Sequence, residues 1–362
     1  MSYFITNNIK IEGIATAVPK NKINYTDFYD QFGKEYMDKF VKSSGIKSLY
    51  KTKEWQTASD LGYAAACNLF DKLGFDRKEL GLLVFATQAP DYKKPGNSSI
   101  LHYRMGLPKE CACVDMYAGC SGFVYGLQTI GAMMQSMDTE YALLIVSDTA
   151  SKQMCENDRS TVVLIGDAGA AILLKKEKSS EPRVTLLEAD GSGYRTLIIP
   201  AGGARYPDAS HDLFHYADGV ERTLYHSHMD GMKVFTFAIQ EVPRAIKDYF
   251  AYTKTRCEDY DALCLHQANL FIMNRVADQI KFGRDKLLIS IDRYGNTSTA
   301  SIPLTLCDYY GDKQGDFKIL ASGFGIGLAW GVTSLQVSAE NIFPVIETDD
   351  YFKEGKIQLG EL

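Results

Sequence analysis

The sequence predicts an α/β protein in which one layered unit occurs twice. Apolar, β-branched runs alternate with amphipathic segments along the chain, which is typical of sheets covered by helices. Three features recur in the same order in both halves: a strand that runs into a loop, a strand followed by a turn and a helix, and a further strand. Any α/β protein alternates in this way, but here the polar residues also fall at matching strand ends. We therefore favour an internal duplication.

The first half contains each feature once. Residues 79–91 predict a buried strand that runs into a loop, residues 112–134 a short strand, a turn of small residues and a helix, and residues 140–150 another strand. The fragment 165–173, which reads IGDAGAAIL, predicts a strand packed closely against another backbone. We expect that fragment to be structural.

The second half repeats the order. Residues 260–269 predict a strand running into a loop, residues 287–306 a strand, a turn and a helix, and residues 317–327 a strand that ends in glycines. In such folds ligands bind beyond the carboxyl ends of strands, where loops lead into helices. Corresponding strand ends of two halves can face each other across a pseudo-twofold axis, so one pocket can receive residues from both.

The division between the halves is expected within residues 174–184, where charged residues, Ser and Pro interrupt the apolar pattern. We predict an N-terminal half over 1–175, a C-terminal half over 176–340 and a tail over 341–362. The sequence pattern indicates no function for that tail.

Composition narrows the class of protein. The 362 residues carry a net charge of −6, with 46% hydrophobic and 23% charged residues, which is enough apolar content for a large core or two fused ones. No run approaches the roughly 18 apolar residues of a membrane span, and the N-terminus lacks the pattern of a secretory signal. The eight cysteines are scattered, which indicates reduced thiols in a cytoplasmic protein. The mild acidity argues against nucleic acid as a main partner.

Cys120 lies in the first strand–turn–helix segment, in the sequence AGCSGF. Gly119 and Gly122 allow a tight turn before a helix that we expect to start near Ser121. A thiol at a helix N-terminus feels the positive end of the dipole and unpaired N–H groups, which favour the thiolate. The same N–H groups can hold the oxyanion of a thioester under attack. The alternative is a buried small hydrophobic residue, the commonest role of a free cysteine.

Two residues of the second half could share a pocket with Cys120: Asn296 lies in the turn that corresponds to that of Cys120, and His266 follows a third strand. His266 follows a predicted strand and could take a proton or donate a hydrogen bond from Nε2, although a satisfied core histidine is the simpler interpretation. Asn296 lies between Gly295 and Thr297 at the predicted opening of a helix, where an N-cap is the ordinary role. As a catalytic group, its amide would polarise a carbonyl without titrating.

The glycine-rich segment 321–331, ASGFGIGLAWG, is not a phosphate loop, because the P-loop lysine is missing and no clear helix follows. It could supply a main-chain N–H near Ile326 as a second oxyanion donor. A tight turn between two strands is the alternative.

Together these motifs resemble the beta-ketoacyl-ACP synthase III family of the thiolase superfamily. The likeness runs from about Ile9 to Val337 and rests on AGCSGF, HQAN, YGNTSTASIP and GFGIGLAWG, with GIATAVP, SDTASK, NDRST, GDAGAA and MDGMKVF in support. It implies that Cys120, His266 and Asn296 form a catalytic triad. It also implies a duplicated five-layer αβαβα fold, normally assembled as a homodimer.

The resemblance implies acyl transfer in two stages. An acyl-CoA would acylate Cys120, while the N–H groups of Cys120 and Ile326 hold the oxyanion. Malonyl-ACP would then lose CO2 in contact with His266 and Asn296, and the enolate would attack the acyl-cysteine. No metal or redox cofactor is expected. Two alternatives stay open: transfer of the acyl group to a hydroxyl or amine of a small molecule, and a catalytically silent partner subunit that only binds.

Substrate recognition is where the chain departs from the family pattern. The resemblance assigns substrate-binding positions to Lys152, Asn269, Phe235 and Lys94. Residues 38–46 lack the Trp and Arg that commonly hold the CoA adenine. Further positions where carrier-docking or polar residues are expected carry other side chains, namely Met232, Phe271, Asp278 and Gln279. These departures affect the expected acyl donor and acyl acceptor more than the expected catalytic residues.

Four of the six histidines gather in residues 211–228: His211, His215, His226 and His228. Their spacings of four and two residues both occur in zinc sites. We favour solvated histidines in an insertion and predict no metal site.

Overall fold

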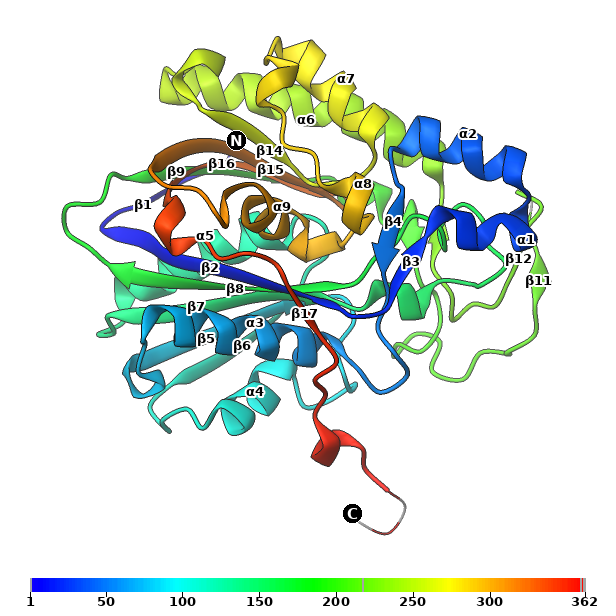
Figure 1. Ribbon diagram of the computed structural model, residues 1–362, viewed down its shortest axis with the longest axis horizontal. Coiled ribbons are helices and arrows are strands. Elements are labelled where there is room, and N and C mark those ends of the chain that lie inside the picture. The colour runs from blue at the N-terminus through cyan, green and yellow to red at the C-terminus, as the bar shows by residue number, and fades with distance from the viewer. Residues whose placement is uncertain (1, 217, 359, 361–362) are drawn as a thin grey trace.

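The computed structural model describes residues 2–216, 218–358 and 360, and Figure 1 shows two sheets stacked between layers of helices. The first sheet has the strand order β17-β2-β8-β7-β5-β6. Its strands are β2 (Ile9–Pro19), β5 (Leu80–Thr87), β6 (Ala112–Tyr117), β7 (Tyr141–Asp148), β8 (Ala168–Lys176) and β17 (Ile346–Thr348).

The second sheet has the order β1-β9-β16-β15-β14. Its strands are β1 (Ser2–Thr6), β9 (Arg183–Ala189), β14 (Ala262–Leu265), β15 (Asp316–Gly325) and β16 (Ala329–Ser338). In the first sheet β2 pairs antiparallel with β8, β8 antiparallel with β7, and β7 parallel with β5. In the second, β9 pairs antiparallel with β16, β16 antiparallel with β15, and β15 parallel with β14. The same sequence of pairings in each sheet is what a duplicated unit produces.

Helices form the other three layers (Figure 1). Helix α5 (Gly122–Ser136) contacts strands of both sheets and is apolar nearly all round, as a central buried helix must be. It shares the central layer with α9 (Ser301–Tyr310). The outer layers consist of α3 (Ala58–Leu73) and α4 (Asn97–Met105) on the first sheet, and of α6 (Gly231–Thr253) and α7 (Leu270–Ile280) on the second. The predicted α/β fold with five layers is therefore confirmed.

Smaller elements connect these layers. Among the described residues they comprise α1 (Tyr29–Phe32), α2 (Lys34–Ser44), α8 (Ile291–Tyr294), β3 (Lys22–Asn24), β4 (Ser48–Tyr50), β10 (Leu197–Ile198), β11 (Phe214–His215), β12 (Glu221–Arg222) and β13 (His228–Met229). No helix in the described ranges is both long enough and apolar enough to cross a lipid bilayer.

Two strands join the sheet of the other half. β1, from the start of the chain, pairs with β9, and β17, from the predicted tail, pairs with β2. Residues 177–182 form the connection between β8 and β9, within the segment expected to divide the halves. The predicted limits of the halves, 1–175 and 176–340, stay predictions, as does the limit of the tail at 341–362.

The small residues of β8 allow close packing, as the sequence predicts. A Cβ on Gly169 would lie 2.5 Å from the main-chain carbon of Leu61 and 2.6 Å from the main-chain nitrogen of Gly62 in α3. A side chain at this position would push the helix off the sheet, so this fragment is structural.

The strand predicted at the start of residues 287–306 is wrong. Only Leu287 makes an isolated parallel bridge, to Leu263 of β14. The side chain of Gln267 takes the place of a neighbouring strand: its Oε1 accepts from the N–H groups of Ser290 and Ile291, and its Nε2 donates to the carbonyl of Leu288. Because these main-chain groups are satisfied by a side chain, no extended ladder forms.

Candidate active site

Cys120 lies between the end of β6 at Tyr117 and the start of α5 at Gly122, so the predicted strand–turn–helix segment is confirmed. The turn fits tightly against the second sheet. A Cβ on Gly325, the last residue of β15, would lie 2.9 Å from the Cys120 Sγ. On the other side, Sγ lies 3.9 Å from the Ser298 hydroxyl. The sulfur therefore lies where the two halves meet.

The pKa of the Cys120 thiol is shifted upward. Desolvation raises the pKa of the thiol to about 11, against smaller opposite contributions from the Ser298 hydroxyl and from the main-chain N–H groups of Ile326 and Cys120. The expectation that the helix N-terminus would favour a thiolate is therefore corrected, because desolvation of the thiol outweighs the hydrogen bonds that these main-chain N–H groups supply. The structure places the two predicted oxyanion donors, the N–H groups of Cys120 and Ile326, at this sulfur; their catalytic role stays a prediction.

The raised pKa predicts how fast Cys120 reacts with iodoacetamide. Only the thiolate is nucleophilic, and well below the pKa its fraction grows about tenfold per pH unit. We expect the rate of carbamidomethylation at Cys120, followed by peptide mass spectrometry, to rise by about that factor per unit from pH 7 to pH 9. A rate that levels off below pH 8 would show a thiolate stabilised at rest and would contradict this reading.

His266 follows β14 directly and is buried. Its main-chain N–H donates to the carbonyl of Ser322, its Nδ1 lies 2.8 Å from the Ser301 hydroxyl, and its ring meets Phe324 edge to face. Burial lowers the pKa of the imidazole to about 3, opposed by a main-chain contact with Ser298. The ring is therefore neutral at pH 7 and suited to hydrogen bonding.

This lowered pKa also makes His266 a source of acid sensitivity. The unfolded chain takes up a proton near pH 6.5 while the native imidazole does not, so the stability that His266 contributes is present above that pH and is lost as pH falls toward its native pKa. Burial raises the pKa values of Asp148 and Asp167, so these carboxyl groups change the stability with pH in the opposite direction. The contribution of His266 must therefore be measured as a difference between the wild type and a variant. Between pH 7.5 and 5.5 we expect urea unfolding to show a loss about 1.4 kcal/mol larger for the wild type than for His266→Gln.

The exposed His211→Gln variant provides the matched control and should behave like the wild type. Equal acid sensitivity of the wild type and His266→Gln would mean that the native imidazole does take up a proton in this range.

Asn296 does not begin a helix, which corrects the N-cap expectation. Its Oδ1 accepts from the Ser298 N–H at 3.0 Å, forming a turn, and α9 starts only at Ser301 after a 3₁₀ turn over Ser298–Ala300. A parallel bridge to Ile165 fixes its main chain, whose N–H donates to Leu164 and whose carbonyl accepts from Gly166. With the amide oxygen engaged, the Nδ2 hydrogens are the donors that remain for a ligand.

Ser298 links the three predicted catalytic residues. It contacts the sulfur of Cys120, the amide of Asn296 and the imidazole of His266. Its backbone has φ +50°, in the left-handed region that non-glycine residues rarely adopt and that clusters at functional sites. Residues from both halves thus meet around one serine, as the sequence pattern predicts. Their assignment as a catalytic triad stays a prediction.

Asp148 is a residue beside the site that the sequence analysis did not predict. It is buried at the end of β7, where it accepts hydrogen bonds from the Thr87 hydroxyl, the Gln88 N–H, and both the N–H and the hydroxyl of Thr299. Gln88 lies against Gly119 beside Cys120, because a Cβ on that glycine would lie 2.2 Å from its Oε1. Asp148 therefore holds the turns that carry Cys120 and Asn296. The available signal was an acidic residue at a strand end, in the motif SDTASK.

Two of the predicted substrate-binding residues lie in loops of the first half. The Lys152 ammonium donates to the main-chain carbonyls of Lys53 and Glu54, at 2.9 and 2.6 Å, and desolvation lowers its pKa. Lys94 is exposed in the loop before α4 and forms no ion pair with the described residues. Neither side chain contacts Cys120, and their binding roles stay predictions.

The other two lie at the junction of α6 and α7. Asn269 is the N-cap of α7, with its Oδ1 accepting from the Ile272 N–H. Phe235 of α6 stacks on Phe271 of α7, with ring centroids 5.7 Å apart. Phe271 is still 53% exposed, and Met232 at the start of α6 is 73% exposed. This surface is apolar where the family resemblance predicts polar or basic groups.

Three of the four histidines of residues 211–228 contact other residues of this segment, and His215 is exposed. His211 stacks on Tyr225, His226 Nδ1 accepts from the Thr223 N–H, and His228 Nε2 lies 3.1 Å from the Thr223 carbonyl. In the part of the chain that the structure describes, no three His, Cys, Asp or Glu side chains are arranged to hold a metal ion.

Comparisons with known proteins match parts of both halves of the chain. A profile described as 3-Oxoacyl-[acyl-carrier-protein (ACP)] synthase III matches residues 114–191, and the profile of its C-terminal part matches residues 250–337. Beta-ketoacyl-[acyl-carrier-protein] synthase III of Clostridium perfringens is 31% identical over 335 residues, which cover 91% of this chain and 99% of the relative. The Streptococcus sanguinis protein of the same name is 33% identical over 330 residues, covering 90% and 98%.

Solved structures extend the similarity to three dimensions. The crystal structure of 3-oxoacyl-(acyl-carrier protein) synthase from Burkholderia xenovorans has a TM-score of 0.90 at 30% identity, and covers 96% of this chain and 99% of that one. The priming beta-ketosynthase of the R1128 polyketide pathway is 21% identical and supports the fold alone.

Proposed function

Because the chain belongs to the 3-oxoacyl-[acyl-carrier-protein] synthase III family of acyltransferases, we propose that it joins an acyl group from an acyl-CoA to a malonyl group carried by acyl carrier protein. The observation that carries this proposal is the meeting of Cys120, His266 and Asn296 around Ser298. The proposed reaction needs no metal or redox cofactor. We further propose a homodimer that acts in the cytoplasm, without a nucleic-acid partner.

In the first stage the Cys120 sulfur attacks the acyl-CoA carbonyl. A bond forms between sulfur and carbonyl carbon, the bond to the CoA sulfur breaks, and the proton of the Cys120 thiol ends on the leaving CoA thiol. The N–H groups of Cys120 and Ile326 hydrogen-bond to the sulfur, and the carbonyl oxygen develops negative charge beside that sulfur once the S–C bond forms. Each such donor lowers the barrier by about 3–4 kcal/mol in other enzymes.

In the second stage the malonyl thioester replaces CoA. Its carboxylate leaves as CO2, and the electron pair of the broken C–C bond passes into an enolate. Neutral His266 and the Asn296 amide donate hydrogen bonds to the enolate oxygen; a neutral donor suits this task because it needs no proton transfer at each turnover. The enolate carbon attacks the acyl-cysteine, the C–S bond breaks, and Cys120 is released to take up a proton.

The test follows both stages in one sample. The enzyme is incubated with acyl-CoAs of increasing chain length, and the Cys120 adduct is measured by intact-mass spectrometry. Malonyl-ACP labelled in its free carboxyl group is then added. Release of labelled CO2 together with a 3-oxoacyl-ACP supports the proposal. Acylation followed by no CO2, or CO2 without a condensed product, would overturn it.

One observation favours a second candidate function. Phe271 exposes apolar surface at a position expected to help dock an acidic carrier protein, Met232 exposes apolar surface where an asparagine is expected, and Asp278 forms an ion pair with Arg284. Such a surface suits a small-molecule hydroxyl or amine as acyl acceptor. Loss of the Cys120 adduct in the presence of such an acceptor, with malonyl-ACP left intact, would select this function instead.

A further inference from the structure

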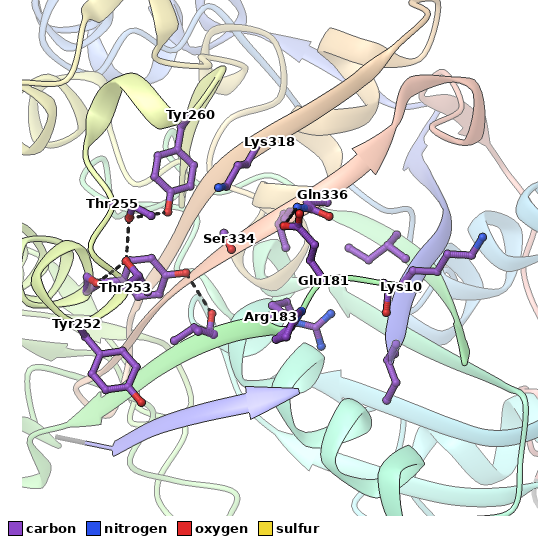
Figure 2. A pocket seen from close by; sticks show the side chains of 17 residues that line it. Lys10, Glu181, Arg183, Tyr252, Thr253, Thr255, Tyr260, Lys318, Ser334 and Gln336 are labelled. Carbon is purple, nitrogen blue, oxygen red and sulfur yellow. Dashed lines mark hydrogen bonds between the residues drawn. The ribbon is translucent and has the colours of Figure 1, made fainter. Parts of the chain in front are cut away.

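A cavity of about 290 Å³ lies outside the site described above. Its walls come from the start of β2, the turn before β9, the end of α6, and the strands β15 and β16. Figure 2 shows Arg183 between Tyr252 and Lys10, with Lys318 and Tyr260 on the opposite wall. The cavity touches β15 at Lys318, whereas Cys120 lies against Gly325, seven residues further along. At ~3.3 Å per residue the two places are roughly 23 Å apart.

Arg183 is the unusual residue of this cavity. It is 93% buried, since only 7% of its surface is exposed. Its guanidinium donates one hydrogen bond, from Nη2 to the Leu127 carbonyl at 3.2 Å, and its Nε has no partner. Among the described residues no carboxylate forms an ion pair with it. Burial lowers the pKa of Arg183 to about 10, so the group still carries its charge at pH 7.

A buried charge of this kind is costly unless an opposite charge accompanies it. The one carboxylate among the described lining residues, Glu181, forms no ion pair with Arg183. The Glu181 carboxylate accepts from the Gln336 amide at 2.5 Å, and Lys10 pairs with Glu12 and Glu177. Lys318 adds a second cation, held over the Tyr260 ring and without an ion pair in the described part of the chain. The cavity thus has an excess of positive charge in a protein whose net charge is −6.

The other residues that line the cavity indicate which kind of ligand would pair with the Arg183 charge. Thr253, Thr255 and Tyr260 form a chain of hydroxyl groups on one wall, joined by hydrogen bonds of 2.7 and 3.1 Å (Figure 2). Apolar side chains of Ile9, Val184 and Leu335 complete the walls. A guanidinium with free N–H groups matches the two oxygens of a carboxylate, and the cavity volume suits a small ligand.

We propose that this cavity binds a small organic monoanion, whose carboxylate lies against the Arg183 guanidinium and whose compact apolar body fills the space beside the tyrosines. The proposal is independent of the function proposed for Cys120.

The test uses benzoate as the probe, with neutral benzamide as its isostere. Isothermal titration calorimetry of the full chain should give a Kd of about 1 mM or lower for benzoate and no measurable binding of benzamide. Arg183→Met should weaken benzoate binding at least tenfold. Arg183→Met removes a buried unpaired charge, so the variant should fold at least as well as the wild type. Crystals soaked with 4-bromobenzoate should place the bromine in this cavity by its anomalous signal.

Further measurements distinguish binding in this cavity from binding at Cys120. Alkylation of Cys120 should leave benzoate binding unchanged, as should Arg284→Met, which removes an exposed arginine. If Arg183→Met fails to fold, Lys318→Gln serves instead and should weaken binding severalfold. Equal binding by the wild type and these pocket variants, bromine at Cys120, or binding at crystal concentration only would each overturn the proposal.

Discussion

Replacing Cys120 by alanine should abolish acyl-enzyme formation and lower the rate of acyl transfer by about 10⁴-fold or more. The reason is chemical, since alanine offers no atom to which the acyl group can be attached. The oxyanion donors and the neutral His266 remain in the variant and can still bind substrate. Intact-mass spectrometry after incubation with acyl-CoA should therefore show the unmodified mass, while the wild type gains one acyl group.

Cys67→Ala is the matched control, because this thiol is also only partly buried but lies in α3, outside the site. It should form the adduct as the wild type does. An adduct that survives in Cys120→Ala and disappears in Cys67→Ala would identify a different nucleophile. The free energy of unfolding of both variants in urea should lie within about 1 kcal/mol of the wild type, because each change removes a single sulfur atom from a partly buried position.

Local patterns were enough to predict which residues meet in this site. Cys120 follows a strand and precedes a helix, and His266 follows a strand, so each is carried to the end of a sheet by its own segment. The duplication then predicts that the ends of the two halves face each other, and both residues do contact Ser298. No long-range information was required for this part of the site.

Properties set by packing could not be predicted in the same way. The helix N-terminus is visible in the sequence around Cys120, but the burial that raises the pKa of its thiol is not, and Gly325 of the other half packs directly against the sulfur. Likewise, the strand expected at Leu287 is replaced by contacts of one glutamine side chain, and Gln267 carries no sequence signal for that role. Propensity and periodicity describe segments, and these effects arise between them.

Replacing Asp148 is the second change with a large expected effect. Its carboxylate accepts hydrogen bonds from both halves of the chain beside the site. Its carboxylate accepts from four donors, two near Cys120 and two on Thr299, which is 151 residues away in sequence. In Asp148→Ala these four donors, three of them fully buried, lose their acceptor. Unsatisfied buried donors cost about 1–3 kcal/mol each, partly offset by removal of a buried carboxyl, so we expect the free energy of unfolding to fall by about 3 kcal/mol or more.

The same change should lower kcat more than it raises KM. Thr299 and Gln88 lie beside Asn296 and Cys120, and an ångström of displacement between reacting groups can cost about 10²-fold in rate. Asp148→Asn keeps one acceptor oxygen and should recover part of both losses, whereas Asp212→Ala, which removes an exposed carboxylate, should match the wild type. If Asp148→Ala lost stability but kept full kcat at a temperature where it is folded, Asp148 would be a structural link without influence on the geometry of the site.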